Sequence, residues 1–172
     1  MRHIKLALAL SLAAQVAQAG VTGSFPSIDG GILNLEDWRG QPVLVVNTAS
    51  QCGYTGQYAD LQTLYETYRD RGLVVLAVPS DDFNQELDTA QDVKEFCEVT
   101  FGLTLPMTDI LSVRGPGAHE FYQDVAAETG FVPAWNFNKV LIGPDGAVVA
   151  TWGSRTKPMS RAITGEIELL LN

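Results

Sequence analysis

The residue with the clearest capacity for chemistry in this sequence is Cys52. It follows an apolar run over residues 43–47 and a short turn of small residues, and helical spacing begins at Gln57. We therefore expect its thiol near the first turn of a helix, where the positive helix end stabilises a thiolate, the nucleophilic form of cysteine. The only other cysteine, Cys97, makes a two-thiol redox cycle feasible.

The first 19 residues have the pattern of a secretory signal peptide. A short basic start precedes an apolar run over residues 6–14, and residues 17–19 fit the small-x-small cleavage pattern. An N-terminal anchor helix fits less well, because the run is too short to span a bilayer and polar residues follow it. We expect cleavage after Ala19, export to a bacterial periplasm and no stable membrane association.

The remaining residues, 20–172, suit a single domain with a full hydrophobic core. Loss of Arg2 and Lys5 with the signal would change the net charge from −9 to −11. Such an acidic protein is not attracted to phosphate backbones, so nucleic acid is not an expected partner. The two cysteines do not form a Cys-x-x-Cys pair, and His119 is the one histidine outside the signal, so we expect neither a metal nor another cofactor.

Strand and helix patterns alternate along the chain and predict the architecture. Apolar runs at 43–47 and 73–78 are typical of buried strands, and a helix is expected between them, from 57 until Gly72 ends it. Further helices are expected at 89–100, 118–127 and 159–171, and further strands at 139–142 and 147–152. This order predicts an α/β, thioredoxin-like fold, in which helices flank a central mixed sheet and an N-terminal β-hairpin precedes it.

In an open α/β sheet, chemistry gathers at the carboxyl ends of the strands. Cys52 lies just past the end of one predicted strand, and residues 79–83 lie just past the end of another. We therefore expect the loop after the second strand to lie beside Cys52.

Several motifs, in the same order, resemble those of the glutathione peroxidase family. Residues 47–55 resemble the motif around the family's reactive residue, and the likeness continues at 79–86, 96–107 and 135–142. It extends over nearly all of the chain after the signal. Because the family reduces peroxides with a cysteine or a selenocysteine, the resemblance implies that Cys52 is the peroxidatic residue of a cysteine form.

The resemblance also implies further site residues, since a glutamine, a tryptophan and an asparagine surround the reactive atom in this family. Trp135 and Asn136 match the last two, and their N–H groups could donate hydrogen bonds to a thiolate or to the leaving oxygen. Asp82 stands at the position assigned to the glutamine, in a loop one residue shorter than usual. An ionised carboxylate there would oppose a thiolate, whereas a protonated one could donate a hydrogen bond.

The resemblance further implies that Cys97, which follows Phe96, is the resolving cysteine of thioredoxin-dependent members. In that cycle a peroxide oxidises Cys52 to a sulfenic acid, Cys97 condenses with it to a disulfide, and an external dithiol reduces the disulfide. A disulfide needs Cα atoms within about 7 Å. If Cys97 lies on a packed helix, we expect distant sulfurs in the reduced state and a mobile segment over 82–105.

The expected partners are a peroxide substrate and a thioredoxin-like dithiol protein. Anionic glutathione suits an acidic surface less well as a reductant. The stretch between Met107 and Trp135 lacks the long insertion that tetrameric family members use to assemble, so we expect a monomer.

Two other functions stay open on the sequence alone. The same cysteines could serve a peroxide sensor that relays oxidation to a partner protein. Alternatively, the chain could be a non-catalytic thioredoxin-fold binding domain with a structural disulfide, which is the ordinary reading of two cysteines in an exported chain. Fast reduction by a general dithiol would favour the enzyme over the sensor. A short distance between the two sulfurs, in a loop that is not mobile, would favour the structural disulfide.

Overall fold

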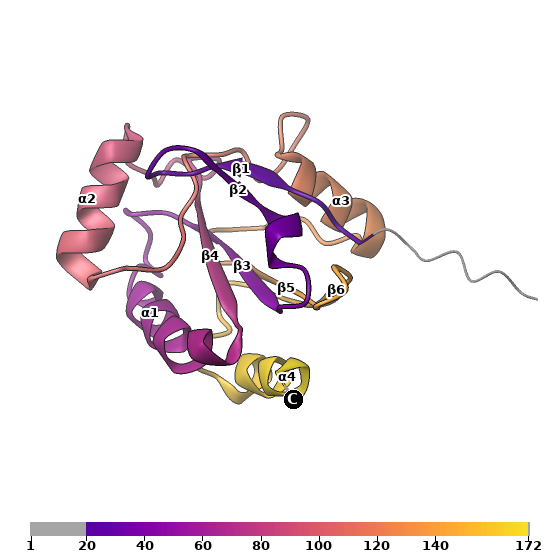
Figure 1. The fold of residues 1–172 in the computed structure, drawn as a ribbon. Coiled ribbons are helices and arrows are strands. Elements are labelled where there is room, and N and C mark those ends of the chain that lie inside the picture. Colours follow the sequence, from indigo (N-terminus) through magenta and orange to yellow (C-terminus); the bar gives the residue numbers. More distant parts are fainter. Residues whose placement is uncertain (1–19, 172) are drawn as a thin grey trace, which may run out of the picture.

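A four-stranded mixed sheet forms the centre of the computed structural model, which describes residues 20–171 (Figure 1). The predicted signal peptide lies outside the described residues. The strand order is β4-β3-β5-β6. The strands are β3 (Val43–Thr48), β4 (Val74–Pro79), β5 (Lys139–Ile142) and β6 (Val148–Trp152). β3 and β4 are parallel, whereas β5 is antiparallel to both β3 and β6.

A short antiparallel hairpin precedes this sheet, formed by β1 (Ser24–Pro26) and β2 (Ile32–Asn34). The mixed sheet, its flanking helices and this hairpin confirm the predicted architecture. The helices are α1 (Gln57–Tyr68), α2 (Ala90–Phe101), α3 (Glu120–Thr129) and α4 (Arg161–Leu170), with single 3-10 turns at Leu35–Trp38 and Arg69–Arg71. Each of the four α-helices lies within a few residues of its expected bounds. None of the helices in the described range is long and apolar enough to cross a membrane.

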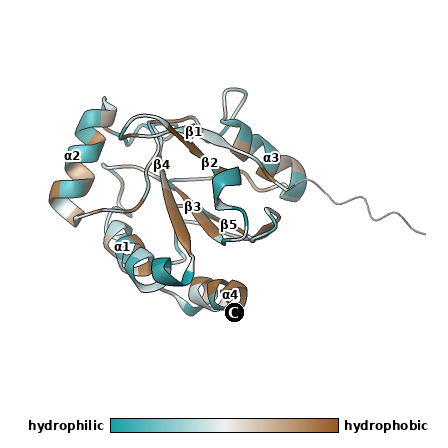
Figure 2. Cartoon of the chain, in the orientation of Figure 1, coloured by the Kyte–Doolittle hydropathy of each residue, from teal (hydrophilic) through white to brown (hydrophobic). Residues whose placement is uncertain are grey.

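The two faces of the sheet bury two hydrophobic clusters, because successive strand residues point to opposite faces. Leu44 and Leu141 pack in the cluster on the side of α1, α2 and α4, whereas Val45 and Val140 pack in the cluster on the side of α3. Figure 2 shows the hydrophobic strands at the centre and the more hydrophilic residues on the helices around them. α2 lies at the margin of the molecule in Figure 1, beyond the edge strand β4.

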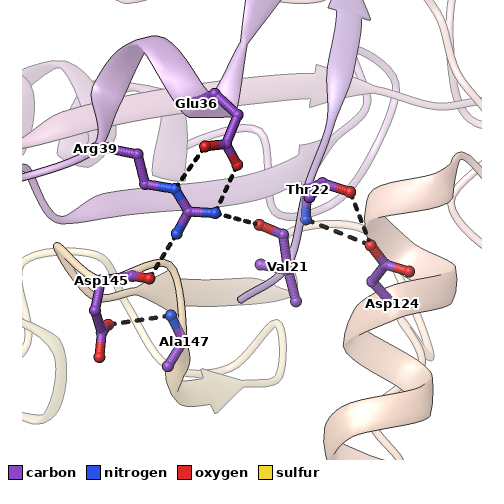
Figure 3. Close-up of polar contacts among 7 residues, drawn as sticks. All are labelled: Val21, Thr22, Glu36, Arg39, Asp124, Asp145 and Ala147. Atoms are coloured by element: carbon purple, nitrogen blue, oxygen red, sulfur yellow. Dashed lines mark hydrogen bonds and ion pairs between the residues drawn. The ribbon is translucent and has the colours of Figure 1, made fainter. Parts of the chain in front are cut away.

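Hydrogen bonds fix the start of the described chain to the body of the domain (Figure 3). The N–H of Val21 donates to the carbonyl of Gly146 in the β5–β6 turn at 3.0 Å. The hydroxyl of Thr22 donates to the Asp124 carboxylate on α3 at 3.1 Å. The Arg39 guanidinium donates to the Val21 carbonyl from the other side. The chain is thus joined to both the sheet and α3 from residue 21 onward.

Candidate active site

Cys52 lies in the connection between β3 and α1, at the carboxyl end of β3. The expectation of a thiol near the first helical turn was wrong, because α1 begins at Gln57 and a run of turns over residues 51–56 precedes it. These turns direct a backbone donor at the sulfur: the N–H of Tyr54 donates to Cys52 Sγ at 3.4 Å. The hydrogen-bond donor to this sulfur therefore comes from the turn and not from the first turn of the helix. Only 4% of Cys52 is exposed.

The loop after β4 lies against this turn, as the positions of the two strand ends predicted. The N–H of Gln51 donates to the carbonyl of Gln85 at 2.8 Å. The N–H of Ser50 donates to Glu86 Oε1 at 2.9 Å. Two consecutive amides just before Cys52 therefore bind two consecutive residues of the loop over 81–88.

A third segment, the approach to β5, joins the site through Asn47 at the end of β3. The Asn47 amide Nδ2 donates to the carbonyl of Trp135 at 3.0 Å, and its Oδ1 accepts from the N–H of Asn138 at 3.0 Å. Between them, Phe137 has a positive φ of 58° and donates its N–H to the Asn47 carbonyl at 2.6 Å. A left-handed conformation is unfavourable for a bulky residue, and such positions persist only where the surrounding contacts impose them.

Asn136 connects this third segment to the loop after β4. Its side chain is fully buried, and its Nδ2 donates to Gln85 Oε1 at 3.1 Å. The neighbouring Trp135 is 41% exposed, and its ring packs on Phe83 with 5.2 Å between centroids. The structure thus brings Trp135, Asn136 and a glutamine amide to the carboxyl ends of the strands, where Cys52 lies.

That glutamine is Gln85, and the assignment of Asp82 to its position is corrected. The Asp82 carboxylate accepts hydrogen bonds from the N–H groups of Val113 and Arg114, at 2.6 and 3.1 Å, and from the Ser112 hydroxyl at 3.1 Å. Asp82 therefore fixes residues 112–114, and the amide in contact with Asn136 comes from three residues later. The Gln85-Glu86 pair, which matches the end of the family's Phe-Gly-x-Gln-Glu stretch, was the signal that could have identified it.

Glu86 is a buried carboxyl group beside the Cys52 turn. Its Oε1 accepts from the N–H groups of Ser50 and Leu87, both at 2.9 Å. Its Oε2 is buried and has no hydrogen-bond partner in the part of the chain that the structure describes. Burial raises the pKa of Glu86, and its hydrogen bonds with Ser50 and Leu87 oppose that shift without reversing it.

Cys97 lies within α2 and is 1% exposed. Both cysteines are free thiols, so no disulfide joins them in this structure. Burial raises the pKa of Cys97 to about 12; the Tyr58 hydroxyl lowers it, whereas the Glu86 and Glu98 carboxylates raise it further. Cys97 is therefore held as a neutral thiol while α2 is packed. The expected distance between the two sulfurs in the reduced state and the expected mobility of residues 82–105 stay predictions.

Two adjoining hollows open beside the Cys52 turn, each with a volume of about 340 Å³. They share Tyr54 and Arg155. Trp135 contributes an apolar wall to the first, and the other is lined by a second cation, Lys157, and by the Asp60 carboxylate. The hollows thus combine aromatic and cationic side chains in an otherwise acidic protein. In the described range, no group of three or more metal-binding side chains could hold an ion.

The fold and the site define a class of protein: thioredoxin-fold proteins with a reactive cysteine between the first core strand and its helix, and without a Cys-x-x-Cys pair. Within that class, the chain belongs to the glutathione peroxidase family, because the family model for glutathione peroxidase matches residues 22–126. As a cysteine-containing member of this family, the protein is a thiol peroxidase.

Individual proteins agree with this membership. The chain is 40% identical to the hydroperoxy fatty acid reductase gpx1 of Synechocystis, over 84% of this chain and 91% of that protein. It is 33% identical to the thioredoxin/glutathione peroxidase BtuE of Escherichia coli, over 84% and 92%. The crystal structure of Trgpx in apo form matches with a TM-score of 0.68 and 30% identity, over 86% of this chain and 92% of that one.

A more distant structure shows the fold alone. The thioredoxin-family thiol:disulfide interchange protein of Chlorobium tepidum superposes with a TM-score of 0.65 at 16% identity, over 90% of this chain and 96% of that one. The thioredoxin-like fold predicted from the sequence is confirmed.

Proposed function

We propose that Cys52 is the peroxidatic cysteine of this thiol peroxidase and that Cys97 is its resolving cysteine. The observation that carries the proposal is the convergence of three segments on the Cys52 turn. The turn directs the Tyr54 N–H at the sulfur, while Gln85 and Asn136 form an amide pair at the same end of the sheet. Donors arranged in advance stabilise charge that develops during a reaction, so this site suits cleavage of a peroxide bond.

In the first step the Cys52 thiolate attacks the terminal oxygen of a hydroperoxide. A sulfur–oxygen bond forms, the oxygen–oxygen bond breaks, and the remaining oxygen leaves as hydroxide or alkoxide and takes up a proton. Cys52 is oxidised to a sulfenic acid while the peroxide is reduced. The N–H groups of Trp135 and Asn136 are the donors that we assign to the leaving oxygen.

In the second step the Cys97 thiol attacks the sulfenic sulfur. The disulfide forms, the sulfur–oxygen bond breaks, and the oxygen leaves as water with the proton from Cys97. An external dithiol protein then reduces the disulfide to two thiols and is itself oxidised. A thioredoxin-like reductant is supported by the relative named thioredoxin/glutathione peroxidase and by the net charge of −9, which repels anionic glutathione.

Hydrogen peroxide and organic hydroperoxides are the proposed substrates. A relative named for hydroperoxy fatty acids supports the larger substrates, as do the hollows beside the turn. The aromatic rings of Tyr54 and Trp135 could contact an acyl chain, and Arg155 and Lys157 could attract a carboxylate.

We also propose that the protein is exported, with a periplasm as its compartment, and that it acts as a monomer. The basic start, apolar run and cleavage pattern of residues 1–19 support export. The short connection between Met107 and Trp135 supports the monomer. N-terminal sequencing of the protein recovered from its native cells would test the first of these proposals, and light scattering would test the second.

Intact mass spectrometry tests the assignment of the two cysteines. Reduced protein treated with one equivalent of hydrogen peroxide is expected to lose two hydrogen atoms, because Cys52 and Cys97 join in a disulfide. Cys97→Ser is expected to gain one oxygen at Cys52, and Cys52→Ser is expected to keep its mass. A wild-type protein whose Cys52 stays a thiol at low peroxide, or whose disulfide is already present and resists dithiols, would refute the assignment.

The N-cap of α2 offers a test of whether this helix must open before Cys97 can form the disulfide with Cys52. Thr89 Oγ1 accepts from the N–H of Asp92 at 3.1 Å, which caps the first turn. Loss of an N-cap costs about 1 kcal/mol of helix stability, so Thr89→Ala should increase the opened fraction about fivefold. We expect faster disulfide formation after peroxide addition in this variant, measured by quenching with an alkylating agent at timed intervals. Thr89→Ser, which keeps the cap, should match the wild type, and equal rates in all three proteins would show that opening does not limit the step.

A further inference from the structure

A lysine occupies a position in the central sheet where an apolar residue is expected. Lys139 begins β5, is fully buried, and points to the same face as Leu141, which packs in the cluster beside α1. Burying a charged ammonium group is costly unless it is paired and hydrogen-bonded. The burial of a charged residue at this position therefore calls for a functional explanation.

The bonds of Lys139 join two segments that are distant in sequence. Its Nζ donates to Gln57 Oε1 at 2.5 Å and to the carbonyl of Thr156 at 2.7 Å. Gln57 in turn donates its Nε2 to the carbonyl of Ser154 at 2.6 Å. One buried ammonium group therefore binds both the first residue of α1 and the loop after β6.

Ser154 extends this chain of hydrogen bonds to the active site. Its hydroxyl donates to the carbonyl of Asn136 at 2.6 Å and accepts from Asn138 Nδ2 at 3.0 Å. The same Asn138 Nδ2 donates to the carbonyl of Trp135 at 2.7 Å. The Asn136 carbonyl is thus held by Ser154 itself, and the Trp135 carbonyl is held by Asn138, which also contacts Ser154, and by Asn47.

We propose that Lys139, Gln57 and Ser154 are positioning residues for peroxide reduction, which act by holding the Trp135–Asn136 backbone so that its side-chain N–H groups face the reacting oxygen. This inference rests on the proposed roles of Trp135, Asn136 and Cys52. Among the described residues, none of the three positioning residues donates a hydrogen bond to Cys52 Sγ, which accepts one from Tyr54. Their effect is on geometry, and a misplacement of about 1 Å in such a site can slow a reaction by about a hundredfold.

The same chain shapes the hollow beside the site. Ser154 and Thr156 line the first hollow together with Trp135, and both are bound at their carbonyls by the Lys139–Gln57 pair. The Lys139 ammonium group therefore influences both the position of the two donors and the position of the hollow's wall. A change in the chain should affect the reaction with peroxide, while the disulfide formed later should react with a small dithiol as before.

The test is Ser154→Ala, compared with Ser154→Thr, which keeps a hydroxyl, and with Ser160→Ala as a matched control. The Ser160 hydroxyl lies just beyond the same loop and has no hydrogen-bond partner among the described residues. Rapid mixing with hydrogen peroxide gives the rate constant of Cys52 oxidation. A second mixing experiment gives the rate at which dithiothreitol reduces the disulfide.

We expect Ser154→Ala to lower the peroxide rate constant about tenfold or more, with the dithiothreitol rate unchanged. Ser154→Thr should recover most of the loss, and Ser160→Ala should equal the wild type. Gln57→Glu provides a second variant that retains an acceptor for Lys139 but cannot donate to Ser154, and it should also slow the peroxide step. This variant keeps the test available if Ser154→Ala folds poorly.

An unchanged peroxide rate in folded Ser154→Ala and Gln57→Glu would overturn the inference. Equal losses in both half-reactions would also overturn it, because they would indicate general structural damage. If wild-type Cys52 itself failed to react with peroxide, the proposed function would fail first, and that result is separate from any difference among the variants.

Discussion

Cys97→Ser is expected to stop turnover with a dithiol protein while leaving the first reaction with peroxide intact. Attack by an oriented thiol of the same chain is far faster than attack by a thiol in solution, so steady-state turnover should fall at least about a hundredfold. The rate constant of Cys52 oxidation should change little, because Cys97 is buried in α2 and belongs to a different segment from the three that converge on the Cys52 turn. Rapid-mixing oxidation and a coupled assay with thioredoxin and its reductase measure the two quantities.

Turnover and the first reaction with peroxide should respond differently because α2 buries the second thiol, Cys97, in an unreactive form. Burial raises the pKa of Cys97 to about 12, and the Glu86 and Glu98 carboxylates add to the shift. A neutral, buried thiol is a poor nucleophile, so the packed helix keeps Cys97 unreactive until it opens. Opening of α2 would remove this burial, so the thiol could ionise and react.

The matched control for Cys97→Ser is Cys97→Ala, because alanine cannot hydrogen-bond in place of the thiol. Both variants should accumulate sulfenic acid and then over-oxidised Cys52 when peroxide is in excess. Full turnover in either variant would show that the external dithiol attacks the sulfenic acid directly. A long-lived mixed disulfide between wild-type protein and one partner, with slow reduction by other dithiols, would instead favour the sensor function.

Sequence reasoning located the parts of the site that follow from strand ends. Cys52 and the loop after β4 were predicted to adjoin because parallel strands end at the same edge of a sheet, and the bonds from Ser50 and Gln51 confirm it. Trp135 and Asn136 were identified by motif, and the structure brings Asn136 against Gln85. Topology was sufficient for the first of these predictions, whereas the second depended on the resemblance to the family's motif.

The assignment of Asp82 failed for a reason that lies in the loop. With one residue fewer than usual, the loop can be aligned from either end, and spacing alone does not choose between the two registers. The structure chooses because the Val113 and Arg114 amides bind the Asp82 carboxylate, which places Gln85 beside Asn136. The hydrogen bonds that fix this register come from residues about thirty positions away, whereas the local Gln85-Glu86 pair was the one sequence signal that favoured it.

The turn before α1 and the burial of Lys139 were missed for a related reason. Helical spacing predicted the start of α1 at Gln57 correctly, but it carried no information on the turns between Cys52 and that start. Lys139 reads in the sequence as one residue of an apolar strand, and its environment comes from α1 and from the loop after β6. Long-range hydrogen bonding between buried polar groups has no periodic signature in a sequence.

The buried lysine leads to a large expected effect on the pH dependence of stability. Burial lowers the pKa of Lys139 from 10.5 to about 8, and Asp60 opposes the shift. Between these pH values the unfolded chain binds a proton that the folded chain has released, so the free energy of unfolding should rise with pH. A shift of this size corresponds to about 3 kcal/mol, all of it absent in a Lys139→Met variant.

Urea denaturation of wild type and Lys139→Met at intervals from pH 7 to 10.5 measures the difference between the two proteins. Other groups contribute in the opposite direction, since burial raises the pKa values of Cys97 and Tyr58, whose ionisation favours the unfolded chain at high pH. Both proteins contain these groups, so their contribution cancels in the difference. The difference should move in favour of the wild type as the pH rises above about 8.

Lys94→Met is the matched control, because Lys94 lies on the surface and pairs with Asp29. That pairing raises the pKa of Lys94, so its contribution to stability is constant below 10.5 and is lost only above that value. The wild-type advantage over Lys94→Met should therefore stay flat across the range in which the advantage over Lys139→Met grows. The stability curves of Lys139→Met and the wild type can diverge only if the protonation of Lys139 differs between the folded and unfolded states. Parallel curves would therefore contradict the lowered pKa of the buried lysine.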